Sequence, residues 1–345
     1  MMVRMRRQQY LNSNLIAHEL ELHITITSGK FMKQRVCLLI ALTLFGALHH
    51  AGATTGQVVE WGMKIGSQTN LLTGLSNVVA VASGYYHSLA VRADGTVVAW
   101  GSNSVGQTNV PAGLSNVVAV AAGEEHSLAL RANGTVAAWG RNNFGLTNVP
   151  AGLSNVVAVA AGYYDNLALR IDGTVVAWGD NANGETNVPF GLSNVVAVAG
   201  GAAHCIALGT DGTVAAWGDN HNGQTKVPVG LSNVVAVAAG EEHSLALRAD
   251  GTVVAWGANY LGQTKVPAGL SNVVAMAAGA NCSLALRADG TVAAWGDNKF
   301  GQTDVPTNLS NVVAVAAGAN CSLALVGNDP PGKTIPHRQI STHRF

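Results

Sequence analysis

VVAVAAGEEHSLALRANGTVAAWG, residues 117–140, is the stretch that decides the fold. Its valine-rich run 117–122 is short and ends at a glycine, which favours a buried strand over a helix. In residues 126–131 the leucines alternate with smaller or polar residues at the period of two that a strand requires. The Asn-Gly pair that follows predicts a tight hairpin, because both residues tolerate a positive φ, and residues 135–139 form the return strand.

The same pattern recurs with a strict period along the chain. All seven tryptophans stand 39 residues apart, at Trp61, Trp100, Trp139, Trp178, Trp217, Trp256 and Trp295. A fixed period of this length indicates repeated supersecondary units that must stack to bury their apolar faces. The sequence therefore predicts an all-β, seven-bladed β-propeller with a tryptophan wedged between neighbouring blades. The stretch after each tryptophan is expected to be a loop, with at most a short outer strand.

The two ends of the repeat region are complementary. The first unit opens with a lone tryptophan strand at residues 57–61, and the last stops at 322–325 without one. Pairing of these two segments would complete the seventh blade and leave no open sheet edge. We therefore expect a single closed propeller over residues 54–327. A linear β-solenoid is the competing architecture, and the complementary ends argue against it.

The segments outside the repeats predict export. Residues 32–53 carry two basic residues, an apolar run and an Ala-Gly-Ala site, the three parts of a secretory signal peptide. The apolar run is too short for a membrane span. Met32 is then preferred to Met1 as the start, and residues 1–31 are an upstream over-extension of the reading frame or a disordered segment. Residues 328–345 are expected to be a disordered tail. We expect a secreted or periplasmic protein.

Composition argues against several functional classes. The formal net charge is zero and charged residues make up 11%, without the basic patch that nucleic-acid binding requires. No Ser/His/Asp order or pair of carboxylates recurs in a catalytic pattern, so we expect neither an enzyme nor a cofactor. Residues 180–184 resemble a calcium loop only faintly, because Ala182 stands where that loop needs Asp or Asn. The chain is expected to be a monomer.

One position in each unit carries a residue type that can bind a metal: His87, His126, Asp165, His204, His243, Cys282 and Cys321. One such group per unit does not give the local pairs of ligands that a metal site requires. A structural histidine bonded to a neighbouring backbone carbonyl is therefore preferred. A Cys282–Cys321 disulfide needs Cα atoms within about 7 Å, and buried free thiols are the simpler interpretation. Cys205 lies one position later in its unit, so its side chain should face the other way.

The copies differ mainly in two connections. The first is the residue pair after each Ala-Ala-Gly, where the candidate binding residues are Tyr85, Tyr86, Glu124, Glu125, Tyr163, Tyr164, Glu241 and Glu242. The second lies four and five residues after each tryptophan, and its candidates are Phe144, Tyr260 and Phe300. Aromatic residues are typical of interfaces, and rigid scaffolds carry binding residues on loops. We predict that loops on one face engage a protein partner. Polysaccharide stacked on tyrosines is the alternative, and neutral drift is the interpretation without function.

The unit AAGxxHSLALxxDGTVxAWG, seen in the copy that ends at Gly257, resembles the regulator of chromosome condensation repeat. The resemblance extends over residues 57–325 and implies a closed seven-bladed propeller. WGxNxxGQTxVP at 256–267 is similar to compact secreted bacterial propellers, including the propeller-type β-lactamase inhibitory proteins. That similarity implies that the following residues face a protein partner: Tyr86, Glu125, Phe144, Tyr164, Glu242, Tyr260 and Phe300.

Overall fold

The computed structural model describes residues 56–63 and 75–327. The chain divides into residues 1–39 and 40–345, and everything described lies in the second unit. The predicted amino-terminal extension, signal peptide and carboxyl-terminal tail therefore lie outside the described residues. Within the described ranges, no helix is both long enough and apolar enough to cross a bilayer.

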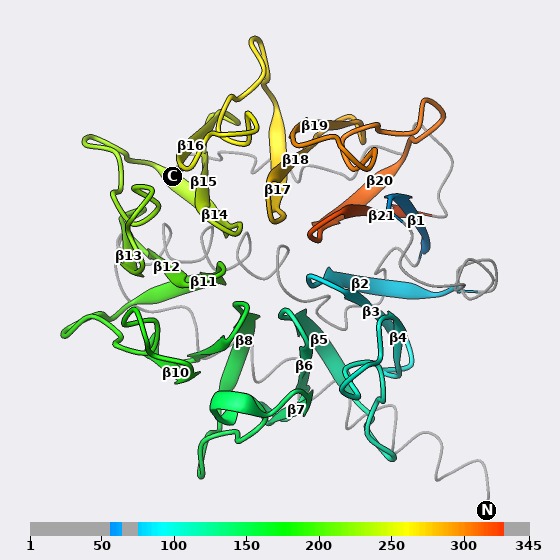
Figure 1. Cartoon of the computed structure of the whole chain (residues 1–345), viewed down its shortest axis with the longest axis vertical. Helices are drawn as coiled ribbons and strands as arrows, with labels where there is room; N and C mark the ends of the chain where they lie inside the picture. The colour runs from blue at the N-terminus through cyan, green and yellow to red at the C-terminus, as the bar shows by residue number, and fades with distance from the viewer. Residues whose placement is uncertain (1–55, 64–74, 328–345) are drawn as a thin grey trace, which may run out of the picture. The chain divides into compact units, whose positions relative to one another are not determined.

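Within the described residues, six repeats each contribute three consecutive strands, and the last contributes two, beside which β1 lies (Figure 1). The first strands are β2 (Val78–Ser83), β5 (Val117–Ala122), β8 (Val156–Ala161), β11 (Val195–Gly200), β14 (Val234–Ala239), β17 (Val273–Ala278) and β20 (Val312–Ala317). The second strands are β3 (His87–Arg92), β6 (His126–Arg131), β9 (Asp165–Arg170), β12 (His204–Gly209), β15 (His243–Arg248), β18 (Cys282–Arg287) and β21 (Cys321–Gly327). The tryptophan strands are β1 (Gly56–Gly62), β4 (Val97–Gly101), β7 (Val136–Gly140), β10 (Val175–Gly179), β13 (Val214–Gly218), β16 (Val253–Gly257) and β19 (Val292–Gly296).

The strands form repeated antiparallel three-stranded sheets. Five such sheets are separate in the described part of the chain, and a sixth sheet joins six strands in the order β20-β21-β1-β2-β3-β4. In that sheet β1 and β2 share a single residue pair, whereas β1 pairs with β21 over its whole length, from Gly56–Gly327 to Gly62–Cys321. The predicted pairing of the two ends of the repeat region is therefore present. The described loops between units contain no outer strand, only one 3-10 turn, η1 (Asn143–Gly145).

The Asp-Gly hairpins are present, but their loops have three residues instead of two. The Gly95 N–H donates to the Arg92 carbonyl at 2.9 Å, and Gly95 has a φ of +77° while Asp94 does not adopt a positive φ. The Asp94 carboxylate instead accepts the Thr96 N–H at 2.9 Å and the Thr96 hydroxyl at 2.6 Å. The predicted hairpin is confirmed, and its connection is a type I turn followed by a left-handed glycine, so that only the glycine needs a positive φ.

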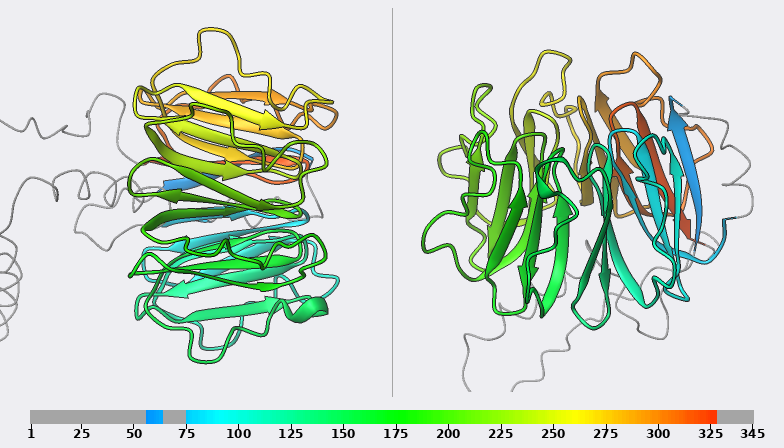
Figure 2. Two further views of the ribbon diagram at one scale, coloured as in Figure 1. Left: turned by 90° about the vertical axis from the view of Figure 1, so that its left-hand side faces the viewer. Right: turned by 60° about the horizontal axis from the view of Figure 1, so that its bottom comes forward.

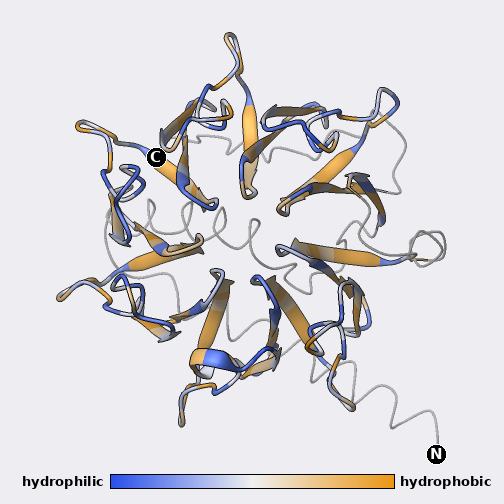
Figure 3. Ribbon diagram, in the orientation of Figure 1, coloured by the Kyte–Doolittle hydropathy of each residue, from blue (hydrophilic) through white to orange (hydrophobic). Residues whose placement is uncertain are grey.

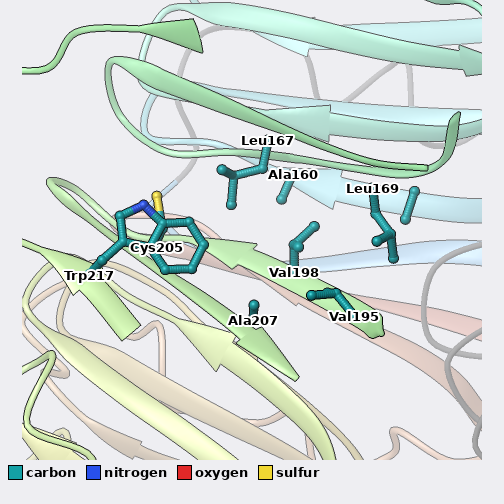
Figure 4. Packing of buried hydrophobic residues seen from close by; sticks show 9 residues of the cluster. Ala160, Leu167, Leu169, Val195, Val198, Cys205, Ala207 and Trp217 are labelled. Atoms are coloured by element: carbon teal, nitrogen blue, oxygen red, sulfur yellow. The ribbon is translucent and has the colours of Figure 1, made fainter. Parts of the chain in front are cut away.

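The core lies between neighbouring sheets. In Figure 4, Trp217 lies beside Leu167 of the preceding sheet and Cys205 of its own sheet, and Leu169 and Val198 belong to the same cluster. The tryptophans are only 2–8% exposed, and apolar colour follows the strands while the loops are mostly polar (Figure 3). The predicted position of the tryptophans between sheets is confirmed.

Six of the seven tryptophans also donate an indole hydrogen bond to a backbone carbonyl of the neighbouring unit, and Trp100 has no such partner among the described residues. Trp139 Nε1 donates to the Gln107 carbonyl at 2.9 Å, and Trp256 Nε1 donates to the Gln224 carbonyl at 2.9 Å. Trp61, at the start of the repeat region, uses the Gln302 carbonyl in the same way at 3.0 Å. The first tryptophan strand thus takes its place against the last repeat.

The first strands end at glycines that approach one another closely around a common centre (Figure 1). These are Gly84, Gly123, Gly162, Gly201, Gly240, Gly279 and Gly318. A Cβ added to any of them would lie 2.1–2.6 Å from the carbonyl oxygen of the next glycine in the series, and Gly318 returns to Gly84. Glycine is required here because no side chain fits between the backbones. The two side views in Figure 2 show the sheets lying next to one another in the order of the chain.

Candidate functional site

The two variable connections of each unit lie beside one another in the structure. Antiparallel pairing sets the beginning of each second strand beside the end of the tryptophan strand, as in the pair His126–Gly140. The Arg141 N–H then donates to the Glu125 carbonyl at 2.8 Å. The corresponding bonds are Ser102 to Tyr86, Asp180 to Tyr164 and Ala258 to Glu242. We call this edge, formed by the residue pairs after the seven central glycines and the loops after the tryptophan strands, the variable rim.

The predicted binding residues differ in exposure. Tyr260, Phe144 and Phe300 in the second connection are 75%, 58% and 37% exposed. The eight candidates of the first connection are each half-buried, from Tyr85 to Glu242. Those eight residues do not belong to freely exposed loops, so their variation among the copies also changes packing.

The structure brings three of the predicted tyrosines together. The Tyr85 ring meets the Tyr163 ring edge-on at 5.2 Å and the Tyr86 ring at 4.5 Å. Phe144 and Tyr164 form a second contact, with ring centroids 5.7 Å apart. Tyr260 instead donates its hydroxyl to Asn222, and Phe300 lies under the Lys299 ammonium at 5.3 Å.

The predicted glutamates occupy two environments on this rim. Glu125 forms an ion pair with Arg141 at 2.7 Å. Glu124 accepts the Tyr164 hydroxyl, and that bond, together with burial, raises the pKa of Tyr164 to about 12. Glu241 is half-buried and accepts the Asn281 side-chain amide at 3.3 Å, and burial raises its pKa, with a further contribution from Glu242.

A cavity of about 70 Å³ opens at the centre of the variable rim. Tyr85, Tyr163 and Glu241 line it, above a wall of the glycines and alanines that end the first strands. The buried Tyr163 hydroxyl donates to the Glu241 carboxylate. Burial and then the Glu241 charge raise the pKa of Tyr163. The cavity therefore combines two aromatic rings with a carboxylate.

A family model for the Regulator of chromosome condensation (RCC1) repeat matches six segments, residues 78–107, 117–146, 156–185, 195–224, 234–263 and 273–302. Together they make up just over half of the chain. The chain belongs to the RCC1 repeat family. No curated protein sequence matches it.

Solved structures show the same RCC1 propeller fold. Prp20p from Saccharomyces cerevisiae, described with its binding to Gsp1p and histones, is 21% identical, with a TM-score of 0.70, covering 88% of this chain and 96% of its own. Yeast RCC1 (Prp20) in complex with Kap60 is 20% identical, with a TM-score of 0.68 and coverage of 89% and 95%. The ectodomain of the receptor kinase CR4 from Physcomitrella patens is 23% identical, with a TM-score of 0.60 and coverage of 70% and 68%.

The histidines of the RCC1 repeats link neighbouring units. Their Nε2 atoms meet a side-chain oxygen of the next unit: His87 with Ser127 at 2.8 Å, His126 with Asn166 at 2.8 Å, His204 with Ser244 at 3.1 Å and His243 with Ser283 at 3.0 Å. The sequence analysis expected each histidine to bond to a neighbouring backbone carbonyl. In the structure its Nε2 bonds to these side chains instead. No group of histidine, cysteine or acidic residues suited to a metal ion occurs among the residues described.

The direction of these hydrogen bonds follows from the second hydrogen bond that each serine or asparagine side chain makes. The Ser127 hydroxyl donates to the Gln107 carbonyl at 2.8 Å, so it must accept from His87. The Asn166 amide likewise donates to the Leu146 carbonyl and presents its oxygen to His126. Each histidine is therefore neutral with its proton on Nε2, and burial is the main cause of pKa values lowered to about 3 or 4.

The third RCC1 repeat departs from this pattern. Asp165 replaces the histidine, and the Cys205 thiol donates to it at 3.2 Å from the next unit. Burial raises the pKa of Asp165 to about 7. Cys282 and Cys321 are buried free thiols, as preferred from the sequence. Cys282 contacts Ser322 of the following unit, whereas Cys205 reaches back to Asp165, so the two side chains face opposite neighbours as expected.

The sequence analysis missed the buried glutamines that hold the second connection. Gln224 and Gln302 are at most 1% exposed, and their side-chain oxygens accept the N–H of Asn222 and Phe300 at 2.9 Å. The recurrence of Gly-Gln-Thr after the tryptophans is the sequence signal that could have pointed to these glutamines. Leu146 replaces this glutamine in one unit, and there the loop forms a 3-10 turn in which Phe144 has a φ of +62°.

Proposed function

We propose that this protein is a non-enzymatic binding propeller that holds a protein partner on its variable rim. The observation that carries the proposal is that both variable connections of each unit meet on one rim, tied by a backbone hydrogen bond such as Arg141 to Glu125. Exposed aromatic residues and carboxylates on a rigid support are typical of protein interfaces. The fold relative Prp20p, with its described binding to Gsp1p and histones, supports a protein as the class of partner.

The proposal includes one closed ring of seven blades. The central glycines support it, because the series of close approaches returns from Gly318 to Gly84. The contact of β20 with β2 supports it, as does the contact of Cys321 Sγ with the Ser83 hydroxyl at 3.5 Å. A linear solenoid would leave its two end units without these contacts.

We further propose that the partner is met outside the cytoplasm and that the protein acts as a monomer. The signal-peptide pattern of residues 32–53 is the support for export. Expression of the full chain with a carboxyl-terminal tag, followed by fractionation and amino-terminal sequencing of the exported form, tests this part. Cleavage after Ala53 is expected, and retention of the uncleaved chain in the cytoplasm would contradict it.

Affinity capture tests the binding proposal. Extracellular and periplasmic proteins of the producing organism are passed over the immobilised full chain and over the double variant Glu125→Lys, Glu242→Lys. Reversal of both rim charges is expected to abolish retention of the partner, which mass spectrometry then identifies. Ala249→Lys, an exposed site on the opposite rim, is the control and should retain it. Equal capture by all three proteins would refute the assignment of the variable rim.

Polysaccharide binding, the alternative from the sequence, has less support. Sugar stacking needs an open aromatic face. Tyr163 is packed edge-on against Tyr85, and Tyr164 lies against Phe144. A glycan array with the full chain should give no signal that depends on Tyr260, the most exposed tyrosine of the rim.

A further inference from the structure

The central cavity of the variable rim has an unusual set of walls. Three units provide large side chains, Tyr85, Tyr163 and Glu241, while Ala280 and Ala319 leave the remaining side open. Glu124 stands in the unit between the two tyrosines and bonds to Tyr164. The rings of Tyr85 and Tyr163 thus meet the Glu241 carboxylate in the central cavity, which residues of all seven units line.

The carboxylate in the wall of the cavity has room for further donors. Glu241 accepts the Tyr163 hydroxyl and, at 3.3 Å, the Asn281 side-chain amide. A carboxylate has about four lone-pair sites, so these two bonds leave part of its capacity for a donor that enters the cavity. An ammonium or guanidinium group offers several N–H donors and no acceptor.

The charge of the surroundings also favours a cation. The Glu241 carboxylate contributes to the raised pKa values of Tyr85 and Tyr163, after the larger effect of burial. This dependence shows that both phenols lie in the negative field of the carboxylate. A cation held near such rings gains cation–π attraction as well as charge-assisted hydrogen bonds.

We propose that this cavity receives one basic side chain, a lysine or an arginine, of the partner protein. The inference rests on the proposed function and names the chemistry of the partner's anchor. The volume of about 70 Å³ suits a single side chain, since sites for small molecules are usually about 300–1,000 Å³. Glu241 neutralises the cation, and the tyrosines cover its alkyl stem.

Fluorine NMR of the full chain labelled with 3-fluorotyrosine tests the cavity directly. The probes are n-butylammonium and methylguanidinium chloride, which mimic the two side chains, with sodium butyrate as the anion of similar size. The signals of Tyr85 and Tyr163, assigned from their Tyr→Phe variants, should shift with either cation in a saturable way. The Tyr260 signal, on the same rim but outside the cavity, should stay unchanged.

A pair of adjacent glutamates supplies the matched variants. Glu241→Gln keeps the shape of the side chain and should weaken binding of both cations about tenfold or more, because a charge-assisted bond is lost. Glu242→Gln removes the neighbouring carboxylate outside the cavity and should leave binding within about twofold. Near-ultraviolet circular dichroism checks that both variants are folded. An equal effect of butyrate, or unaltered binding in Glu241→Gln, would overturn the proposal.

The captured partner separates this inference from the proposed function. Loss of the partner in Glu241→Gln but not in Asp211→Asn, which removes an exposed carboxylate of a hairpin turn on the opposite rim, supports a basic anchor. If the partner is held equally by Glu241→Gln and lost by the rim charge reversals, the rim binds a protein without such an anchor, and only the inference fails. If every variant retains the same proteins as the full chain, the proposed function fails, while the NMR titration still decides the chemistry of the cavity.

Discussion

The buried histidines share one protonation state because their neighbours leave no choice. His87 gives its Nε2 proton to Ser127, which gives its own to a backbone carbonyl, and Nδ1 is buried without an acceptor. A second proton on the ring would therefore be charged, buried and unpaired. The repeat unit uses the histidine as a fixed donor, which explains why cysteine can replace it in the last two units.

Acid should destabilise the fold through these histidines. Their folded pKa values, about 3 for His243 and about 4 for His126, lie below the unfolded value of 6.5. Their contribution is complete above pH 6.5 and is lost as the pH falls toward the folded pKa, by roughly 2–3 kcal/mol per histidine between pH 7 and pH 4.5. Urea unfolding at pH 7 and pH 4.5 measures it. His243→Cys, which copies the residue at Cys282, should show a smaller loss than the unmodified chain, and an equal loss would contradict this account.

Asp165 should have the opposite dependence on pH. Its pKa is raised from 3.8 to about 7, so its contribution is complete below pH 4 and is lost as the pH rises through about 7. Asp165→Asn should therefore gain stability over the unmodified chain between pH 5 and pH 8, by roughly 1–3 kcal/mol. Asp211→Asn is the control, because Asn133 already fills the same exposed turn position, and its difference should not change over this range. A constant difference for Asp165→Asn would count against a protonated Asp165.

The asparagine before each first strand adopts a left-handed backbone conformation. Asn233 has a φ of +55°, and its carbonyl accepts the Ala249 N–H at 2.9 Å. The left-handed region costs most residues about 1–2 kcal/mol, which asparagine and glycine largely avoid. Asn233→Ala should lower the unfolding free energy by about 1 kcal/mol in a denaturant titration, while Asn233→Gly should stay within about 0.5 kcal/mol. Equal losses in the two variants would show that the side chain matters instead.

The strands were the most predictable elements. β5 and β6 begin and end at the predicted residues because alternation and flanking glycines define them locally. The hairpins were also predicted, because Asp-Gly and Asn-Gly mark them locally, whereas the length of their loops was not. The hydrogen bonds from histidine to serine and from serine to a glutamine carbonyl were not predicted. They join residues about 40 and 20 positions apart, which only the packed sheets bring together. In the site, the two connections were predicted, whereas the half-buried state and the central cavity depend on neighbouring units.

The tryptophan strands hold the sheets together by both packing and a hydrogen bond. Trp217 fills the space between two sheets and donates to the Glu185 carbonyl at 2.7 Å. Trp217→Ala should cost roughly 3–5 kcal/mol, and Trp217→Phe, which keeps most of the contact but loses the donor, should cost roughly 1–3 kcal/mol. Thermal and chemical unfolding of both variants gives these values. Equal costs would mean that the hydrogen bond contributes nothing beyond the ring.

The whole molecule depends on contact between its first and last repeats. Trp61 reaches Gln302, and Met63 N–H reaches the Asn320 carbonyl at 2.8 Å. These bonds put the last residue pair on the same rim as the others. In the proposed closed ring, these bonds complete the circumference of the variable rim and the walls of the central cavity.

Hydrogen exchange of the β1 amides tests this closure most directly. In β1 the residues 56–62 pair with residues 321–327, so mass spectrometry should find β1 protected as strongly as β16, an internal strand of the same kind. Exchange of β1 at the rate of an unstructured peptide, with β16 still protected, would show that the ends are apart and would contradict the closed ring.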